Sequence, residues 1–237
     1  MLWLSTCALG CDAAATRESA GSSQPALPAS RAAPPPKPRS LPALSLRQPT
    51  LALPHVALGR WPTPIRRCRT LGRELGIERL FVKDDGPAAE AYGGGKIRKL
   101  EYLLAVAPGR RVITFGGIGS NHAVATAIMG AKLGLQVELW LAPQRASDAV
   151  RCNLRAMAAS GAKVVLFPSV WQAEREARRL TRGSARVIPP GGTSPTGNAG
   201  FVSAGYEIAA QVRAGVMPEP DVVFIAMGTM GAAAGLT

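Results

Sequence analysis

The sequence has few cysteines and few histidines. Its 237 residues include four cysteines, with no Cys-x-x-Cys pair, and two histidines, His55 and His122. Structural zinc sites need clusters of these residue types, so we predict no metal site. A Ser-His-Asp hydrolase is not supported either, because no Gly-x-Ser-x-Gly motif accompanies the histidines.

Long apolar runs are also lacking. No stretch of about 18 uninterrupted apolar residues occurs, and the longest candidate, 222–236, is broken by three glycines. We therefore predict no membrane span. The aromatic content is only 5%, but 47% of the residues are hydrophobic, enough for a real core. A disulfide-stapled mini-protein and a wholly disordered chain are both excluded.

Acidic residues are outnumbered: the formal net charge is +13. Such a surface suits an anionic partner, such as nucleic acid or a phosphorylated small molecule. However, the basic residues are scattered, with no run of five like charges and no aromatic and basic platform. We predict no nucleic-acid partner. A nucleic-acid binder driven by charge stays the alternative, to be tested at low salt, where phosphate contacts are strongest.

Residues 1–50 differ in composition from the rest. Eleven of the 20 prolines precede residue 65, and Pro34-Pro35-Pro36 is typical of an extended segment. We predict a Pro/Ala-rich disordered head or linker. Residues 1–11 are apolar and end in a box that resembles a bacterial lipoprotein cleavage site, but no Lys or Arg precedes them. A cytoplasmic location is predicted, with export or lipoprotein anchoring as the alternative.

From about residue 58 the pattern becomes regular. Apolar, β-branched runs predict buried strands, and Ala-rich or charge-paired stretches between them predict helices. Strands are expected at 80–82, 112–115, 137–141, 164–167 and 222–226, and helices at 121–133, 147–160 and 173–180. Alternation of strand and helix with short Gly-marked joins predicts an α/β fold with parallel sheets.

The first of three Gly-rich turns precedes a lysine. It reads Tyr92-Gly93-Gly94-Gly95-Lys96, and consecutive glycines let backbone approach a ligand closely. A phosphate-binding Walker A loop is not matched, because Ile97 stands where Ser or Thr is required. The simpler alternative is a loop with a solvated lysine at a helix start.

The second turn, 116–122, contains Ser120-Asn121 at a predicted helix start. Ser and Asn cap helices with their side-chain oxygens, and a helix N-terminus can also bind an anion. A dinucleotide fingerprint is discounted, because His122 fills its third Gly position. The third turn, 228–235, follows a strand and is suited to wrap backbone N–H groups around a phosphate or to pack closely. Turns at strand ends of one sheet converge on ligands.

Several segments together resemble one family of enzymes. They run from about residue 50 to the chain end: Pro62-Thr63-Pro64-Ile65, Val82-Lys83-Asp84-Asp85, 92–101, 116–122, Gly191-Gly192-Thr193-Ser194-Pro195 and the turn at Gly228. The chain resembles the 1-aminocyclopropane-1-carboxylate deaminase and D-cysteine desulfhydrase family. These are tryptophan-synthase-β-like, fold type II enzymes dependent on pyridoxal 5′-phosphate (PLP).

The resemblance implies roles for particular residues. Lys96 would form the Schiff base with the cofactor aldehyde, and Asn121 would hydrogen-bond the ring oxygen. Ser120 would face the substrate carboxylate or assist proton transfer. The phosphate would lie in the turn formed by Gly228, Thr229, Met230, Gly231 and Ala232. The sequence departs from the family pattern at Gly95, Gly119, Met230 and Ala232.

The resemblance also implies domains, a reaction and an assembly. A smaller α/β domain at 97–185 is inserted in a larger cofactor-binding domain, 51–96 and 186–237, which is incomplete at its C-terminal end. The expected function is a PLP-dependent lyase or deaminase that acts on a small amino acid and releases ammonia and an oxo-acid. A non-catalytic remnant that keeps the fold and an anion or PLP site is the alternative. A homodimer is expected.

Overall fold

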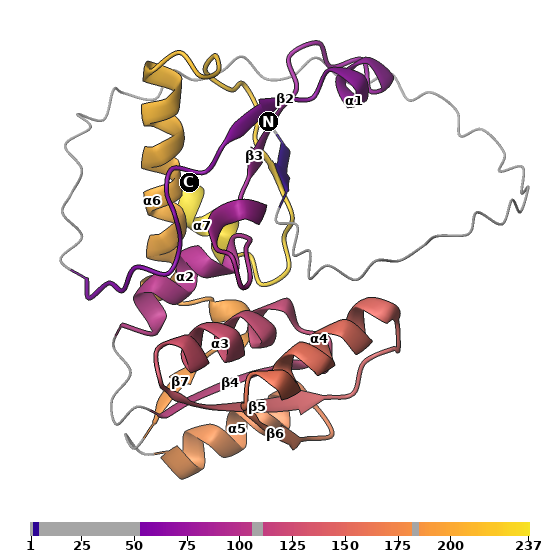
Figure 1. Ribbon diagram of the computed structural model, residues 1–237, viewed down its shortest axis with the longest axis vertical. Helices are drawn as coiled ribbons and strands as arrows, with labels where there is room; N and C mark the ends of the chain where they lie inside the picture. Colours follow the sequence, from indigo (N-terminus) through magenta and orange to yellow (C-terminus); the bar gives the residue numbers. More distant parts are fainter. Residues whose placement is uncertain (1, 5–52, 106–110, 182–184) are drawn as a thin grey trace, which may run out of the picture.

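The computed structural model describes residues 2–4, 53–105, 111–181 and 185–237. The strands of these residues form two four-stranded sheets, one in the upper and one in the lower unit of the view in Figure 1. The first has the order β2-β3-β1-β8, from Ile65–Arg67, Phe81–Asp84, Leu2–Leu4 and Phe224–Ile225. The second has the order β6-β5-β4-β7, from Lys163–Leu166, Gln136–Ala142, Arg111–Gly117 and Arg186–Ile188.

All pairs in the second sheet are parallel, and helices cover both of its faces. These helices are α3 (Asn121–Lys132), α4 (Asp148–Ala159) and α5 (Val170–Thr181). Successive side chains of β4 point to opposite faces, as strand geometry requires. Val112 packs with Val124 on the α3 side, whereas Phe115 packs with Ala173 on the α5 side. The strands therefore read as continuous apolar runs.

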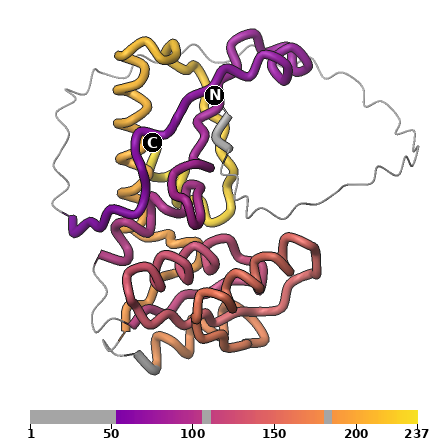
Figure 2. The backbone as a smooth tube through the Cα atoms, viewed as in Figure 1, coloured from indigo at the N-terminus to yellow at the C-terminus, as the bar shows by residue number. Residues whose placement is uncertain are grey.

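The first sheet is mixed. Strands β1, β3 and β8 are parallel, but β2 pairs antiparallel with β3 at the edge. Four helices accompany it: α1 (Arg69–Glu74), α2 (Lys96–Leu103), α6 (Pro195–Arg213) and α7 (Gly231–Leu236). Figure 2 shows the chain leaving the first unit after α2, building the second, and returning in α6. Helix α2 consequently lies at the junction of the two units.

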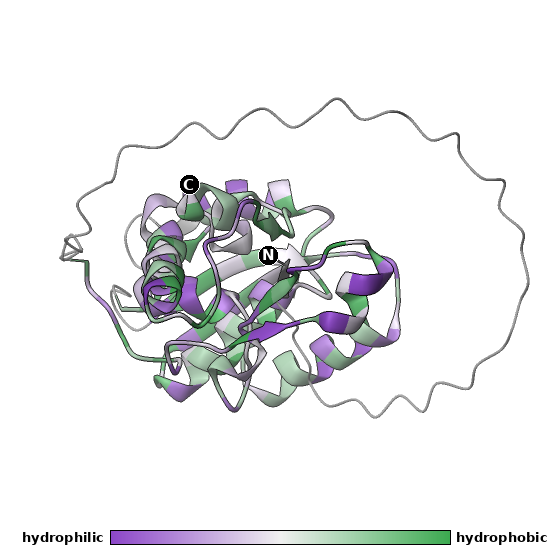
Figure 3. Cartoon of the chain, turned by 90° about the horizontal axis from the view of Figure 1, so that it is seen from above, coloured by the Kyte–Doolittle hydropathy of each residue, from purple (hydrophilic) through white to green (hydrophobic). Residues whose placement is uncertain are grey.

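Four helices of the described ranges begin at serines, as the capping rule predicts. Ser120, Ser147, Ser169 and Ser194 each accept a hydrogen bond from the backbone N–H three residues ahead. Figure 3 shows that the helices carry both polar and apolar residues. This distribution is typical of helices that pack one face on a sheet. No helix in the described ranges combines the length and hydropathy that a bilayer crossing requires.

The α/β fold with parallel strands is confirmed, and most predicted elements lie within a few residues of their predicted places. One strand is much shorter than predicted: 222–226 reduces to Phe224–Ile225. Its partner β1 has only three residues, and the register pairs Leu2 with Phe224 and Trp3 with Ile225. The pairs with β1 therefore include Phe224 and Ile225 but not Val222 or Val223.

Two other predictions meet the structure only in part. Residues 2–4 form β1 and are paired on both sides, unlike the predicted disordered head, while 5–50 lie outside the described residues. Strand β7 pairs with β4, so the second sheet extends past residue 185, where the smaller domain was predicted to end. The domain ranges themselves stay a prediction.

Candidate functional site

Lys96 is the first residue of α2, and the glycines before it are needed for its placement. Gly94 has φ +96°, a conformation that side chains disfavour, and its N–H donates to Asp85 O at 2.7 Å. Gly93 lies so close to Gly86 O that a Cβ would collide with it. The Gly-Gly-Gly run therefore lets this loop pack on the segment after β3 and start α2 at Lys96.

The Lys96 amine lies in a partly buried environment. The side chain is half-buried, and burial lowers its pKa below the ordinary 10.5. Burial disfavours the charged form, so more of the amine is neutral near pH 7 than for a solvated lysine. A neutral amine is the form that attacks a carbonyl carbon. Lys96 is thus not the fully solvated lysine of the simpler interpretation.

A second lysine lies one helical turn further on, and the sequence interpretation gave it no role. Lys99 is 1% exposed, and its Nζ donates to Gly191 O and to Thr193 Oγ1, each at 3.2 Å. Burial and the neighbouring charge of Lys96 lower its pKa to about 8. Two ammonium groups packed this closely favour an anion between or beside them.

The turn at 228–232 meets Lys99. A Cβ on Gly231 would stand 2.6 Å from Lys99 Nζ and 2.6 Å from Thr193 Oγ1, so a larger residue there would displace these groups. Thr229 Oγ1 lies 2.6 Å from Thr193 Oγ1. Met230 has φ +57° and is 64% exposed, and Ala232 is partly buried at the start of α7. The turn thus brings two hydroxyls and a buried ammonium together, beside the exposed Gly228.

The second Gly-rich turn supplies an amide and a cap. Ser120 Oγ accepts from Ala123 N at 3.3 Å, so its capping role is direct. Asn121, the first residue of α3, is exposed. Its Oδ1 accepts from Asn153 Nδ2 at 2.9 Å, and Tyr92 Oη lies 3.4 Å from the same oxygen. Because Tyr92 belongs to the loop before Lys96, this contact joins the first and second turns.

His122 lies under the site as a neutral, buried ring. Its Nε2 is 3.1 Å from Thr114 Oγ1, and that hydroxyl donates to Ile188 O. Burial, followed by the charges of Lys96 and Lys99, lowers its pKa to about 3. The ring is therefore uncharged at physiological pH.

The three turns thus converge on the first turn of α2, and comparisons with known proteins agree with this arrangement. The family model described as "Pyridoxal-phosphate dependent enzyme" matches residues 56–237. The chain belongs to this family. Its fold type II architecture is confirmed by the solved structure of an "ACC deaminase homologue". That structure is 33% identical, with a TM-score of 0.64, over 78% of this chain and 58% of that one.

Two curated relatives are similar over most of this chain. A Pyrococcus horikoshii protein named "Putative 1-aminocyclopropane-1-carboxylate deaminase" is 36% identical over 195 residues, covering 78% of this chain and 58% of the relative. A Yersinia pestis D-cysteine desulfhydrase is 32% identical over 206 residues, covering 81% of this chain and 62% of the relative. The chain therefore spans about three fifths of the length of these relatives.

The residues present fit PLP, the cofactor of this family. The cofactor carries a phosphate, an anionic ring oxygen and an aldehyde. The phosphate matches Lys99 with the hydroxyls of Thr193 and Thr229. A Cβ on Gly231 would crowd Lys99 Nζ and Thr193 Oγ1. The ring oxygen matches a donor amide such as that of Asn121, and the aldehyde matches the Lys96 amine.

Sequence interpretation missed the supporting residues for an identifiable reason. Lys99 lies within the matched motif, but a lysine three residues after another at a helix start is usually solvated. Asn153 lies in a predicted helix, 32 residues from Asn121, and no local pattern marks the contact. The roles predicted for Lys96, Ser120, Asn121 and 228–232 remain predictions. The structure supplies their placement.

Proposed function

We propose that this chain carries the PLP site of a lyase or deaminase that acts on a small amino acid. The substrate would be D-cysteine or 1-aminocyclopropane-1-carboxylate, as the names of its relatives suggest. One observation carries the proposal: Lys96, with a pKa lowered by burial, lies one helical turn from the buried, hydroxyl-lined ammonium of Lys99. That pairing offers a nucleophile and an anion site on one helix.

Each side chain has a proposed task. Lys96 holds the coenzyme covalently through its amine, and Lys99 with Thr193 and Thr229 holds the phosphate beside Gly228–Ala232. Asn121 donates to the ring oxygen, and Ser120 faces the substrate carboxylate or assists the transfer of its α-proton. The bound cofactor supplies an electron sink for the bonding electrons released at the substrate α-carbon. Elimination of sulfide from D-cysteine, or ring opening of 1-aminocyclopropane-1-carboxylate, followed by hydrolysis with one water molecule, would yield ammonia and an oxo-acid.

Covalent attachment is the first test. Wild-type protein incubated with PLP should gain a visible absorbance band, and borohydride reduction should fix the adduct on the peptide that contains Lys96. The variant Lys96→Ala should lose both. Lys132→Ala, at an exposed lysine in the last turn of α3, is the matched control and should keep both. A well-folded wild-type protein with an unmodified Lys96 peptide would overturn the proposal.

Turnover is a separate test from attachment. Ammonia release from D-cysteine and from 1-aminocyclopropane-1-carboxylate distinguishes the two proposed activities, since only the first also releases sulfide. Attachment of PLP without ammonia from any D- or L-amino acid would favour the non-catalytic alternative. A homodimer and a cytoplasmic location belong to the same proposal. Light scattering and cell fractionation test them.

A further inference from the structure

Asn153, on α4, makes two hydrogen bonds that leave no choice in the orientation of its amide. The residue is 8% exposed, and its Nδ2 donates to Gly119 O at 2.8 Å and to Asn121 Oδ1 at 2.9 Å. A backbone carbonyl can only accept. The Asn153 atom that faces Gly119 O is therefore the nitrogen, and both of its hydrogens are used.

This orientation determines the orientation of Asn121. The second hydrogen of Asn153 Nδ2 needs an acceptor, so the Asn121 atom that faces it is Oδ1. Tyr92 reaches the same end of Asn121, with its Oη 3.2 Å from the backbone oxygen and 3.4 Å from Oδ1. The accepting end of the Asn121 amide thus meets donors on α4 and on the loop before Lys96. Its NH₂ group must turn the other way.

We propose that Asn153 is a positioning residue that sets the polarity of Asn121, so that Asn121 presents N–H donors to the coenzyme. An anionic ring oxygen is the acceptor that such a donor serves best, whereas a reversed amide would set oxygen against oxygen. This inference rests on the proposed function, in which Asn121 contacts that ring oxygen. It adds Asn153, which lies outside the three Gly-rich turns, to the residues proposed to serve the coenzyme.

Two variants test the polarity. Asn153→Leu removes the donors, and we expect PLP affinity, measured by equilibrium dialysis, to fall about three- to tenfold. Asn153→Asp replaces the donor with an acceptor that favours the reversed Asn121 amide. We expect a larger loss, about tenfold or more. The pH midpoint of the visible band should also rise in both. A ring oxygen without its donor retains more negative charge. It therefore holds the proton on the nearby Lys96 nitrogen more strongly, which raises the midpoint.

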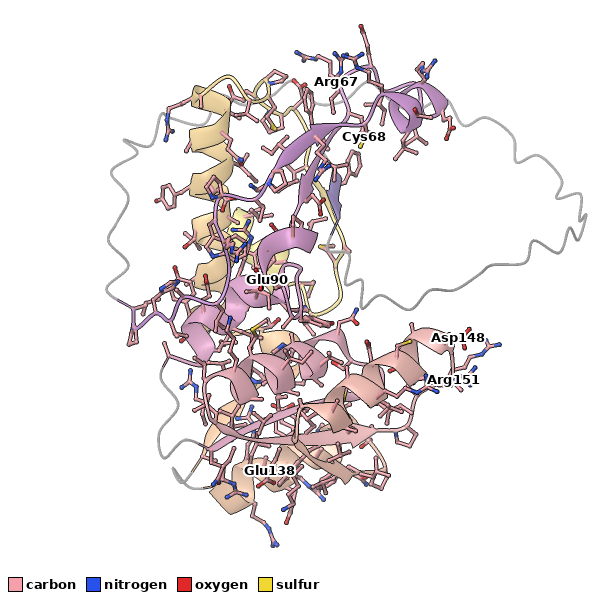
Figure 4. All side chains as sticks on the ribbon, viewed as in Figure 1. Arg67, Cys68, Glu90, Glu138, Asp148 and Arg151 are labelled. Carbon is pink, nitrogen blue, oxygen red and sulfur yellow. The ribbon has the colours of Figure 1, made fainter. Side chains whose placement is uncertain are left out.

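A double-mutant cycle separates positioning from simple support of the fold. In an Asn121→Ala background, Asn153→Leu should change PLP affinity less than about twofold, because the group it orients is gone. Arg151→Ala is the control on the same helix: its side chain pairs with exposed Asp148 at the outer end of α4 (Figure 4). It should leave affinity and midpoint unchanged.

The outcomes are distinct. Equal effects of Asn153→Leu in both backgrounds, or unchanged affinity and pH midpoint in folded Asn153→Leu, would overturn the positioning role while leaving the proposed function in place. Failure of the wild-type protein to bind PLP would overturn the proposed function, and this inference with it.

Discussion

Lys96 and Lys99 have the same side chain and lie one turn apart on α2, but their surroundings assign them different chemistry. Lys96 is half-buried, and burial is the cause of its lowered pKa. Lys99 is fully buried against Thr193 and the Gly191 carbonyl, and the charge of Lys96 adds to the effect of burial. The first is thus suited to covalent attachment and the second to holding an anion.

The role of Lys99 predicts a pH dependence of anion binding. Inorganic phosphate has no aldehyde for Lys96, so it probes the anion site alone. Its affinity should fall as pH rises above 8, because the Lys99 pKa is about 8 and the neutral amine no longer attracts phosphate. Lys99→Met should weaken phosphate about tenfold or more at pH 7 and should flatten this dependence. Isothermal titration calorimetry measures both.

A control is needed because Lys96 also titrates. Lys96→Ala should keep the fall in phosphate affinity above pH 8, although the midpoint should move upward when the neighbouring charge is lost. A phosphate affinity that is the same in wild type and Lys99→Met across the whole range would contradict the assignment.

At the scale of elements, the start of α7 contains a local conflict between sequence and backbone. Met230 is its N-cap and has φ +57°, a left-handed conformation that costs a residue with a Cβ about 1–2 kcal/mol. Because Met230 is 64% exposed, its side chain offers little burial to offset that cost. The turn shape, rather than the side chain at this position, is what the site requires.

Met230→Gly should therefore stabilise the protein by about 1 kcal/mol, seen as a higher urea midpoint with an unchanged slope. Met230→Ala is the control, because alanine keeps the Cβ and should give no gain. If Ala stabilises as much as Gly, the backbone conformation is not the cause. A loss of stability in Met230→Gly would show that the methionine side chain makes a contact worth more than the strain.

Elements were predictable where their signals are local. The Ser caps and the apolar runs of β4 and β5 mark those segments within the sequence itself. Strand β8 was overestimated and β1 was missed, because each depends on a partner far away in the chain: Leu2 pairs with Phe224. The composition of a short segment does not indicate which distant strand it will pair with.

At the scale of the whole molecule, one buried ion network holds the first unit together around α2. Glu207 on α6 accepts hydrogen bonds from Thr63, Lys83 and Arg98. These donors lie between 109 and 144 residues away from Glu207 in the sequence. Arg98 also pairs with buried Asp85 at 2.7 Å. Since Arg98 lies between Lys96 and Lys99, the network fixes the helix that carries both lysines.

Glu207→Gln should destabilise the fold by roughly 3–5 kcal/mol at pH 7, because it leaves the buried charges of Lys83 and Arg98 under-compensated. Urea unfolding measures this. Glu90→Gln is the control: Glu90 pairs with Arg60, but both side chains are exposed. The change should stay within about 0.5 kcal/mol, as for other surface pairs.

The same network predicts a pH dependence of stability. Burial opposes ionisation of Glu207, but the hydrogen bonds and charges of Arg98 and Lys83 prevail and lower its pKa below 4.5. A carboxyl with a lowered folded pKa contributes stability that is fully present above pH 4.5 and is lost as pH falls through the folded value. Wild type should lose this contribution in acid. In Glu207→Gln the corresponding part of the loss should be absent.

The sequence by itself determined the fold class, the order of most elements and the place of Lys96 at the start of a helix. Apolar periodicity, caps and ordered motifs depend on residues that are neighbours in the sequence. Only the tertiary structure decided that Lys99 is buried against the 228–232 turn and that Asn153 donates a hydrogen bond to Asn121. The Glu207 network was likewise a tertiary result. Burial and pairing between distant segments depend on how the chain packs, and lysine, asparagine and glutamate have the same local signature whether solvated or buried.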